Sequence, residues 1–152
     1  MTKIIAAFPG TGKSYFARSI ENGGVLDSDS SEFSWTIQRG EKIRNPEFPD
    51  NYMDHIAERL GDTAVILVSS HEDVRDALVD RGYDFTLVYP GPELREEYME
   101  RYRERGSPDA FIDFIDQNWD NFINQLREQP GATHAELGSG QYISDIIASF
   151  EA

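Results

Sequence analysis

Short apolar runs alternate with segments of helical periodicity along this chain of 152 residues. The run over residues 64–68 is apolar at every position, as expected for a strand that is covered on both faces of a parallel sheet. Four other short runs also read as strands, and apolar residues recur at helical spacing between them. The predicted strands cover residues 4–8, 24–26, 64–68, 85–89 and 135–137. The predicted helices cover residues 14–20, 50–60, 70–82, 93–105, 107–128 and 142–150.

This alternation predicts an α/β fold of three layers, with a five-stranded parallel sheet flanked by helices. Ser70 and Asp73 have the spacing of a capping box, which predicts that the third helix begins there. Residues 28–49 are polar and interrupted by Gly40 and Pro46, which predicts an irregular loop region or a short lobe on the substrate side. With no internal repeat and no linker, residues 1–152 are expected to form a single domain.

Composition narrows the classes of function. The chain has 28 acidic and 14 basic residues, a net charge of −14 and no cysteine. The missing cysteines exclude disulfides, thiolate metal sites and a cysteine nucleophile. The acidic balance argues against general binding of duplex DNA, whose affinity comes from many phosphate contacts. No segment is apolar for long enough to cross a membrane, and the N-terminus lacks a secretory signal, so a cytoplasmic protein without a membrane partner is expected.

The strongest chemical signal lies over residues 7–14, Ala-Phe-Pro-Gly-Thr-Gly-Lys-Ser, between the first strand and the first helix. It matches the phosphate-binding Walker A motif, except that Ala7 replaces the first glycine. Lys13 would reach the β- and γ-phosphates of ATP, and the Ser14 hydroxyl would bind Mg²⁺. The alternative is a turn with a surface lysine. The residues expected to bind the nucleotide are Pro9, Gly10, Thr11, Gly12, Lys13 and Ser14.

A second signal is Asp27-Ser28-Asp29, directly after the second predicted strand. This D-S-D resembles the motif of shikimate-kinase-like small-molecule kinases. The whole chain is similar to the P-loop nucleoside and nucleotide kinase superfamily, especially to the short kinases of bacteriophages. The resemblance implies that Asp27 helps to hold Mg²⁺ and that Asp29 accepts the proton of an acceptor hydroxyl. An acidic turn or a helix cap is the alternative interpretation.

The resemblance also implies a helical lid at about residues 94–108, closing over ATP in a P-loop kinase fold. Arg101 and Arg105 lie four residues apart and would bring positive charge to the transferring phosphoryl group, with Gly106 as a hinge. Because Glu97 precedes Arg101 by four residues, an ordinary exposed helix with a surface ion pair is the alternative.

Arg39 and Arg44, with Lys42 between them, are expected either to bind the acceptor or to form a solvated basic loop. Together these features predict an ATP- and Mg²⁺-dependent phosphotransferase acting on a nucleoside- or nucleotide-type acceptor, in the host cytoplasm if the chain is phage-encoded. Two alternatives stay open. One is a phage DNA-modification kinase that phosphorylates 5-hydroxymethyluracil, a modified base in DNA. The other is a nucleotide-binding regulator that catalyses nothing.

Overall fold

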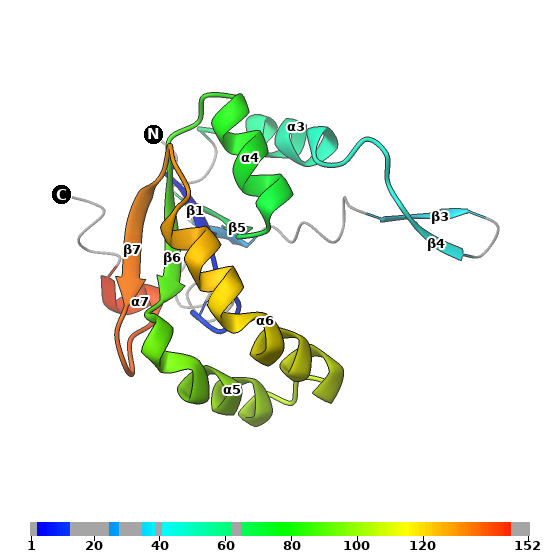
Figure 1. The fold of residues 1–152 in the computed structure, drawn as a ribbon. Coiled ribbons are helices and arrows are strands. Elements are labelled where there is room, and N and C mark those ends of the chain that lie inside the picture. Colours follow the sequence, from blue (N-terminus) through cyan, green and yellow to red (C-terminus); the bar gives the residue numbers. More distant parts are fainter. Residues whose placement is uncertain (1–2, 13–24, 28–34, 39–40, 62–64, 147–152) are drawn as a thin grey trace.

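A parallel sheet with the strand order β2-β5-β1-β6-β7 forms the centre of the computed structural model (Figure 1). The structure describes residues 3–12, 45–61 and 65–146 in full, and the backbone of residues 25–27, 35–38 and 41–44. The predicted α/β class, with a parallel sheet flanked by helices, is confirmed. The strands of this sheet are β1 Lys3–Ala7, β2 Val25–Asp27, β5 Val65–Ser69, β6 Phe85–Pro90 and β7 Thr133–Leu137.

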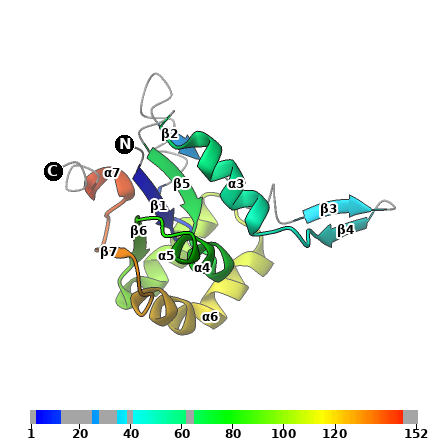
Figure 2. The ribbon, with the colours of Figure 1, turned by 90° about the horizontal axis from the view of Figure 1, so that it is seen from above.

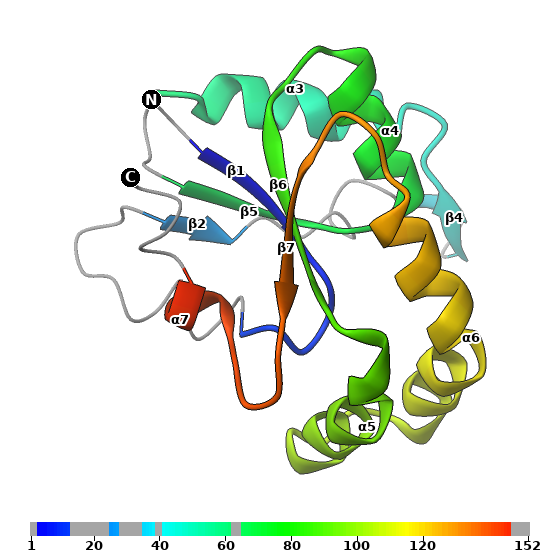
Figure 3. The same ribbon diagram turned by 60° about the vertical axis from the view of Figure 1, so that its left-hand side comes forward.

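Helices cover both faces of the sheet, and the side chains of β1, β5 and β6 alternate between two apolar clusters. In β1, Ile4 and Ala6 belong to the larger cluster, whereas Ile5 and Ala7 belong to the smaller one on the opposite face. The larger cluster contains the buried sides of α3 Asp50–Arg59, α4 Glu72–Asp80, α5 Arg95–Glu104 and α6 Asp109–Arg127. The smaller cluster includes Ile143 of α7 Ile143–Ile146, which lies apart from α3 to α6 (Figure 3).

The order of the strands creates a switch point at β1. Strands β5 and β2 lie on one side of β1, with β5 next to β1 and β2 beyond it. Strands β6 and β7 lie on the other side of β1. The chain then continues outward from β6 to β7 through the short helix η2 Pro92–Leu94, α5 and α6. In open α/β sheets, ligands bind at the carboxyl ends of the strands where connections leave in opposite directions. That edge, close to α5 and α7, is therefore the first place to look for a site (Figure 1).

The stretch expected to be an irregular loop region or a short lobe contains an antiparallel hairpin, β3 Trp35–Gln38 and β4 Glu41–Arg44, which projects from the body beyond α3 (Figures 1 and 2). An irregular loop is therefore wrong for these residues, whereas a short lobe agrees with the hairpin. The expected capping box does not form, because His71 is the N-cap residue of α4 and no side chain caps the helix. Ser70 stands one position too early, and its carbonyl oxygen accepts a hydrogen bond from Nε of Arg75 at 2.8 Å.

Other predictions lie partly outside the described residues. The predicted helix over residues 14–20 lies entirely outside them, as do residues 147–150 of the last predicted helix. The last strand begins at Thr133, two residues earlier than expected. Among the described helices, none is long and apolar enough to cross a membrane.

Candidate phosphate-binding site

The candidate site is built on the turn that follows β1. Ala7 is buried and pairs with Ser69 of β5 and Val88 of β6, and the Phe8 N–H donates to the carbonyl of Val88 at 2.9 Å. Ala7, which occupies the first glycine position of the motif, is thus still part of the strand. Because a residue in an extended strand needs no positive φ, alanine is compatible with this position. The turn proper starts at Pro9.

Three consecutive carbonyl groups of this turn are bound by residues that lie far away in the sequence. The carbonyl of Pro9 accepts a hydrogen bond from Tyr102 Oη (2.8 Å), and that of Gly10 accepts one from Arg101 Nη1 (2.8 Å). The carbonyl of Thr11 accepts a hydrogen bond from the N–H of Ile143 (2.9 Å). In a trans peptide the carbonyl and the N–H point in opposite directions. The N–H groups of Gly10, Thr11 and Gly12 therefore face away from the donors on α5 and α7. Within the described part of the chain, these three N–H groups donate to no acceptor.

The two glycines of the turn are needed for both conformation and space. Gly10 and Gly12 have φ values of +87° and +90°, in the region that side chains rarely adopt. A Cβ atom on Gly10 would lie 2.9 Å from Cε1 of Tyr102, and one on Gly12 would lie 3.0 Å from Cδ1 of Tyr142. Aromatic rings are therefore packed directly against the turn. The Thr11 side chain is buried and donates to the carbonyl of Phe8 at 2.7 Å, which closes the turn from within.

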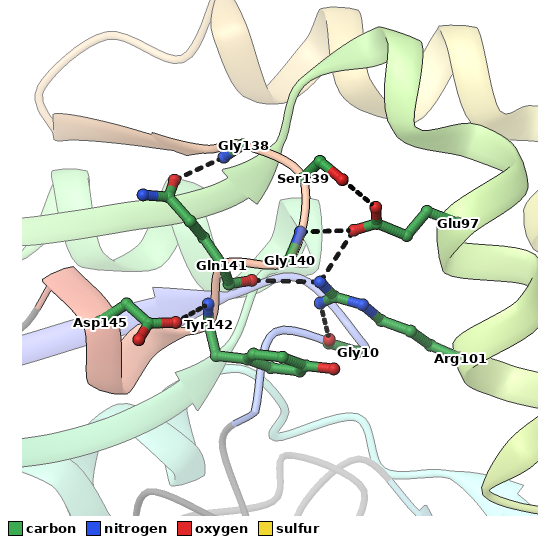
Figure 4. Close-up of polar contacts among 9 residues, drawn as sticks. All are labelled: Gly10, Glu97, Arg101, Gly138, Ser139, Gly140, Gln141, Tyr142 and Asp145. Carbon is green, nitrogen blue, oxygen red and sulfur yellow. Dashed lines mark hydrogen bonds and ion pairs between the residues drawn. The ribbon is translucent and has the colours of Figure 1, made fainter.

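Arg101 joins the turn to the loop after β7 (Figure 4). Besides its bond to Gly10, its guanidinium donates from Nη2 to the carbonyl of Gln141 at 3.2 Å. Its Cζ lies 4.3 Å from the ring centroid of Tyr98 and 4.0 Å from that of Tyr142. The side chain is only 10% exposed. This arginine is thus held between two rings and directed at backbone carbonyl groups.

Glu97 also contacts Arg101, and its carboxylate accepts hydrogen bonds from three donors. They are the Ser139 hydroxyl (2.5 Å), the Gly140 N–H (3.0 Å) and Arg101 Nη2 (3.0 Å). The hydrogen bonds from Ser139 and Gly140, helped by the positive charge of Arg101, hold the pKa of Glu97 below its usual range. The expected ion pair of Glu97 and Arg101 is present, but it contacts two loops and is not simply a feature of an exposed helix.

The tyrosines of α5 form the apolar support of the turn. Burial raises the pKa of Tyr98 to about 12 and also raises the pKa of Tyr102, so both phenols stay protonated at neutral pH. Tyr102 uses its hydroxyl to bind Pro9. The hydroxyl of Tyr98 is buried and has no hydrogen-bond partner among the described residues.

Arg105, the other expected lid arginine, lies apart from the turn. It is exposed, its Nε donates to the Ser107 hydroxyl at 2.8 Å, and its Cζ lies 4.9 Å from the ring centroid of Tyr102. The helix that carries it packs into the larger apolar cluster through Tyr98, Met99 and Tyr102. The expected lid, at about residues 94–108, thus contains the helix α5. Its role as a lid remains a prediction.

The remaining expected site residues lie outside the fully described part of the chain. Lys13, Ser14, Asp29 and Arg39 are outside the described residues. The backbone of Asp27 ends β2, where it pairs with Leu67 of β5, and that of Arg44 ends β4, where it pairs with Trp35. Within the described residues, no group of three or more His, Asp or Glu side chains is arranged to hold a metal ion.

Tyr102, Tyr142 and Ile143 are among the residues of this site that were not predicted. The four-residue spacing of Tyr98 and Tyr102 places both side chains on one face of the helix, but it does not indicate what that face contacts. Ile143 contributes a backbone N–H, which every residue except proline carries, so no sequence signal distinguishes it.

Comparison with other proteins adds no family assignment. No protein-family model matches the sequence, and a search of curated proteins finds no significant relative. Inferences about function therefore rest on the motif, the fold and the geometry of the turn.

Proposed function

We propose that this chain is an ATP- and Mg²⁺-dependent phosphotransferase of the P-loop kinase type, with a hydroxyl group of a nucleoside- or nucleotide-type molecule as the acceptor. The observation that carries the proposal is the orientation of the peptide groups between Pro9 and Gly12. Their carbonyl groups are bound on the protein side, and their N–H groups face the other way. Successive backbone N–H groups after a strand are a recurrent binding site for phosphate oxygens.

The place of the turn in the sheet supports the same proposal. The turn leaves the carboxyl end of β1, beside the point where the direction of the connections changes. Ligands of open α/β sheets bind at such points. Since Lys13 and Ser14 directly follow the described turn, a phosphate group bound to the N–H groups would lie within their reach.

In the proposed reaction each residue has a separate task. Lys13 neutralises charge on the β- and γ-phosphates, and Asp29 takes the proton of the acceptor hydroxyl as that oxygen attacks the γ-phosphorus and ADP leaves. Ser14 and Asp27 would hold Mg²⁺. A hydroxyl and a carboxylate are hard oxygen ligands of the kind that Mg²⁺ prefers, and β2 ends at Asp27 on the same edge of the sheet as the turn. When bound, the ion would neutralise charge that develops on the phosphate oxygens.

The arginines divide between two proposed tasks. Arg101 contacts backbone carbonyl groups and is nearly buried, so its charge stabilises the turn. Arg105 is exposed and is the better candidate for contact with the transferring phosphoryl group when the segment 94–108 acts as a lid. Arg39 and Arg44 remain candidates for binding phosphate groups of the acceptor.

A transfer assay with γ-labelled ATP tests this proposal. The acceptors are nucleosides, nucleotides, sugars and DNA containing 5-hydroxymethyluracil. We expect label on one class of free nucleoside or nucleotide, and we expect Asp29→Asn to abolish transfer while ATP still binds, because an amide accepts a proton poorly. Asp84→Asn is the control, because Asp84 is exposed and precedes β6 at the opposite edge of the sheet.

The other outcomes of the assay identify the alternatives. Label on DNA alone would favour the DNA-modification kinase. ATP binding without transfer to any acceptor would favour the regulator. Wild-type transfer by Asp29→Asn would remove Asp29 as the base and favour a kinase whose acceptor is a phosphate group.

A further inference from the structure

The turn after β1 and the loop of residues 138–142 are connected by the ion pair of Glu97 and Arg101 on α5 (Figure 4). Arg101 donates to the carbonyl of Gly10 in the turn and to the carbonyl of Gln141 in the loop. Glu97 accepts from Ser139 and Gly140 in the loop and from Arg101 itself. These two segments are about 130 positions apart in the sequence, yet one ion pair connects them.

A second connection runs parallel to this one. Ile143, directly after the loop, donates its N–H to the carbonyl of Thr11 at 2.9 Å. The ring of Tyr142 lies against Gly12 and also close to the guanidinium of Arg101. The peptide group between Thr11 and Gly12 is therefore bound by the residue that directly follows the loop. The peptide group between Gly10 and Thr11 is connected to the loop only through Arg101.

We propose that Glu97 and Arg101 are positioning residues that couple the 138–142 loop to the turn, so that the loop must be in place for the N–H groups to bind phosphate. For its ligand, this inference rests on the proposed function. The coupling is reciprocal, since a ligand that needs the ordered turn also stabilises the ordered loop. Neither residue touches the reacting atoms in this account.

The geometry explains why these two residue types are suited to the task. A planar guanidinium donates along fixed directions, so one arginine can bind two carbonyl groups and a carboxylate while its faces stack on two rings. A lysine keeps the charge but has no planar fork and cannot reproduce this set of contacts. Arg101→Lys is therefore the informative variant, because it removes the geometry and keeps the charge.

The positioning role differs measurably from that of a lid arginine. A lid arginine acts on the transition state, so its loss lowers kcat and leaves the affinity for ATP almost unchanged. A positioning residue of the turn acts on ground-state binding of phosphate. Its loss weakens the binding of any ligand that uses the N–H groups, including one that never reacts.

The test compares Arg101→Lys and Glu97→Gln with Arg103→Lys and Glu100→Gln. The controls replace the same residue types on the same helix, in an exposed pair 3.2 Å apart. The first measurement is amide hydrogen exchange without ligand. We expect exchange of Gly140 and of Ile143 to increase about tenfold in the two test variants and to be unchanged in the controls. Faster exchange at Gly140 with an unchanged rate at Ile143 would overturn the coupling.

The second measurement is calorimetric titration with inorganic pyrophosphate in the absence of any acceptor, so that binding to the turn is measured without phosphoryl transfer. We expect the Kd of the test variants to rise about tenfold and that of the controls to match wild type. An unchanged Kd in either folded test variant would overturn the positioning role of the residue that it replaces. Thermal unfolding of each variant verifies that it is folded. If Arg101→Lys does not fold, Glu97→Gln alone tests the positioning role.

The two measurements also separate this inference from the proposed function. If wild-type protein binds neither pyrophosphate nor ATP, the proposed function is wrong, and the exchange of Gly140 and Ile143 alone decides the coupling. If wild type binds both ligands and the exchange rates of the test variants stay at the wild-type value, the coupling is wrong and the proposed function stands.

Discussion

Arg101 binds the carbonyl oxygen of Gly10 at 2.8 Å, across 91 positions of the chain. A charged hydrogen bond of this kind fixes the direction of one peptide group, and Tyr102 and Ile143 fix the neighbouring two. The turn thus owes its shape to α5 and α7 as much as to its own glycines. Mutations in α5 are expected to alter phosphate binding even where they touch no ligand.

The first prediction concerns Gly10. We expect Gly10→Ala to abolish ATP binding and to lower the free energy of unfolding by about 2 kcal/mol or more, because alanine is strained at positive φ and its Cβ meets the Tyr102 ring. Calorimetric titration and urea unfolding measure the two effects. The control is Gly61→Ala, since Gly61 has a similar φ of +92° but no atom within 4 Å of the added Cβ.

For this control we expect a stability loss of about 1 kcal/mol from backbone strain, with ATP binding intact. Equal stability losses in the two variants would show that the contact between Gly10 and Tyr102 is unimportant. ATP binding at wild-type affinity in Gly10→Ala would contradict the conformation of the turn described above.

The second prediction compares two tyrosines of α5. We expect Tyr102→Phe to lower the free energy of unfolding by about 1 kcal/mol, because the carbonyl of Pro9 loses its donor, and to weaken ATP binding. Tyr98→Phe removes a buried hydroxyl without a partner among the described residues, so its stability should equal or exceed that of wild type. Urea unfolding measures the stability of both variants. If Tyr98→Phe proved less stable than Tyr102→Phe, the hydrogen bonding described for the two hydroxyl groups would be wrong.

The third prediction is a pH dependence that comes from Glu97. Its pKa is lowered in the folded protein, mainly by the hydrogen bonds from Ser139 and Gly140. The stability that its carboxylate contributes is therefore fully present above the unfolded pKa of about 4.3 and is lost as the pH falls through the folded value. Consequently the difference in unfolding free energy between wild type and Glu97→Gln should be largest near neutral pH and should shrink below about pH 4.

Urea unfolding at a series of pH values measures this difference. Glu100→Gln is the control, because an exposed ion pair contributes little, and its stability should stay within about 0.5 kcal/mol of wild type. A difference for Glu97→Gln that grows as the pH falls would contradict the contacts assigned to this carboxylate.

The sheet was predictable where burial on both faces leaves a continuous apolar run. Strand β5 is such a run, and the structure describes it over Val65–Ser69, which includes four of the five predicted positions. The long helix α6 was also predictable from its period. Its buried residues are Ile112, Ile115, Trp119, Ile123 and Leu126, and Phe111 and Phe122 pack partly buried against the same cluster. The hairpin of β3 and β4 was not predictable, because it lies outside the main sheet and so is not part of the alternation of strands and helices from which the fold was predicted.

The candidate site was predictable only in its local part. The glycine spacing of the turn follows from its own conformation, so the motif at Gly10 and Gly12 can be recognised. The i, i+4 spacing of Glu97 and Arg101 was also visible in the sequence. That spacing does not show that the pair contacts the turn and the loop and is not directed at solvent. That direction depends on the packing of α5 against the turn and on the path of the loop after β7, which are long-range contacts.

The most direct test of the account is a calorimetric titration of the protein with ATP and Mg²⁺, using wild type, Lys13→Ala and Lys3→Ala. Lys3 begins β1 at the opposite end from the turn, so its replacement is a matched control for the loss of one lysine. We expect wild type and Lys3→Ala to bind ATP with equal affinity, and we expect Lys13→Ala, although folded, to bind at least about tenfold more weakly. Equal affinity in Lys13→Ala, or no binding by wild type, would contradict the claim that this turn is a phosphate-binding loop.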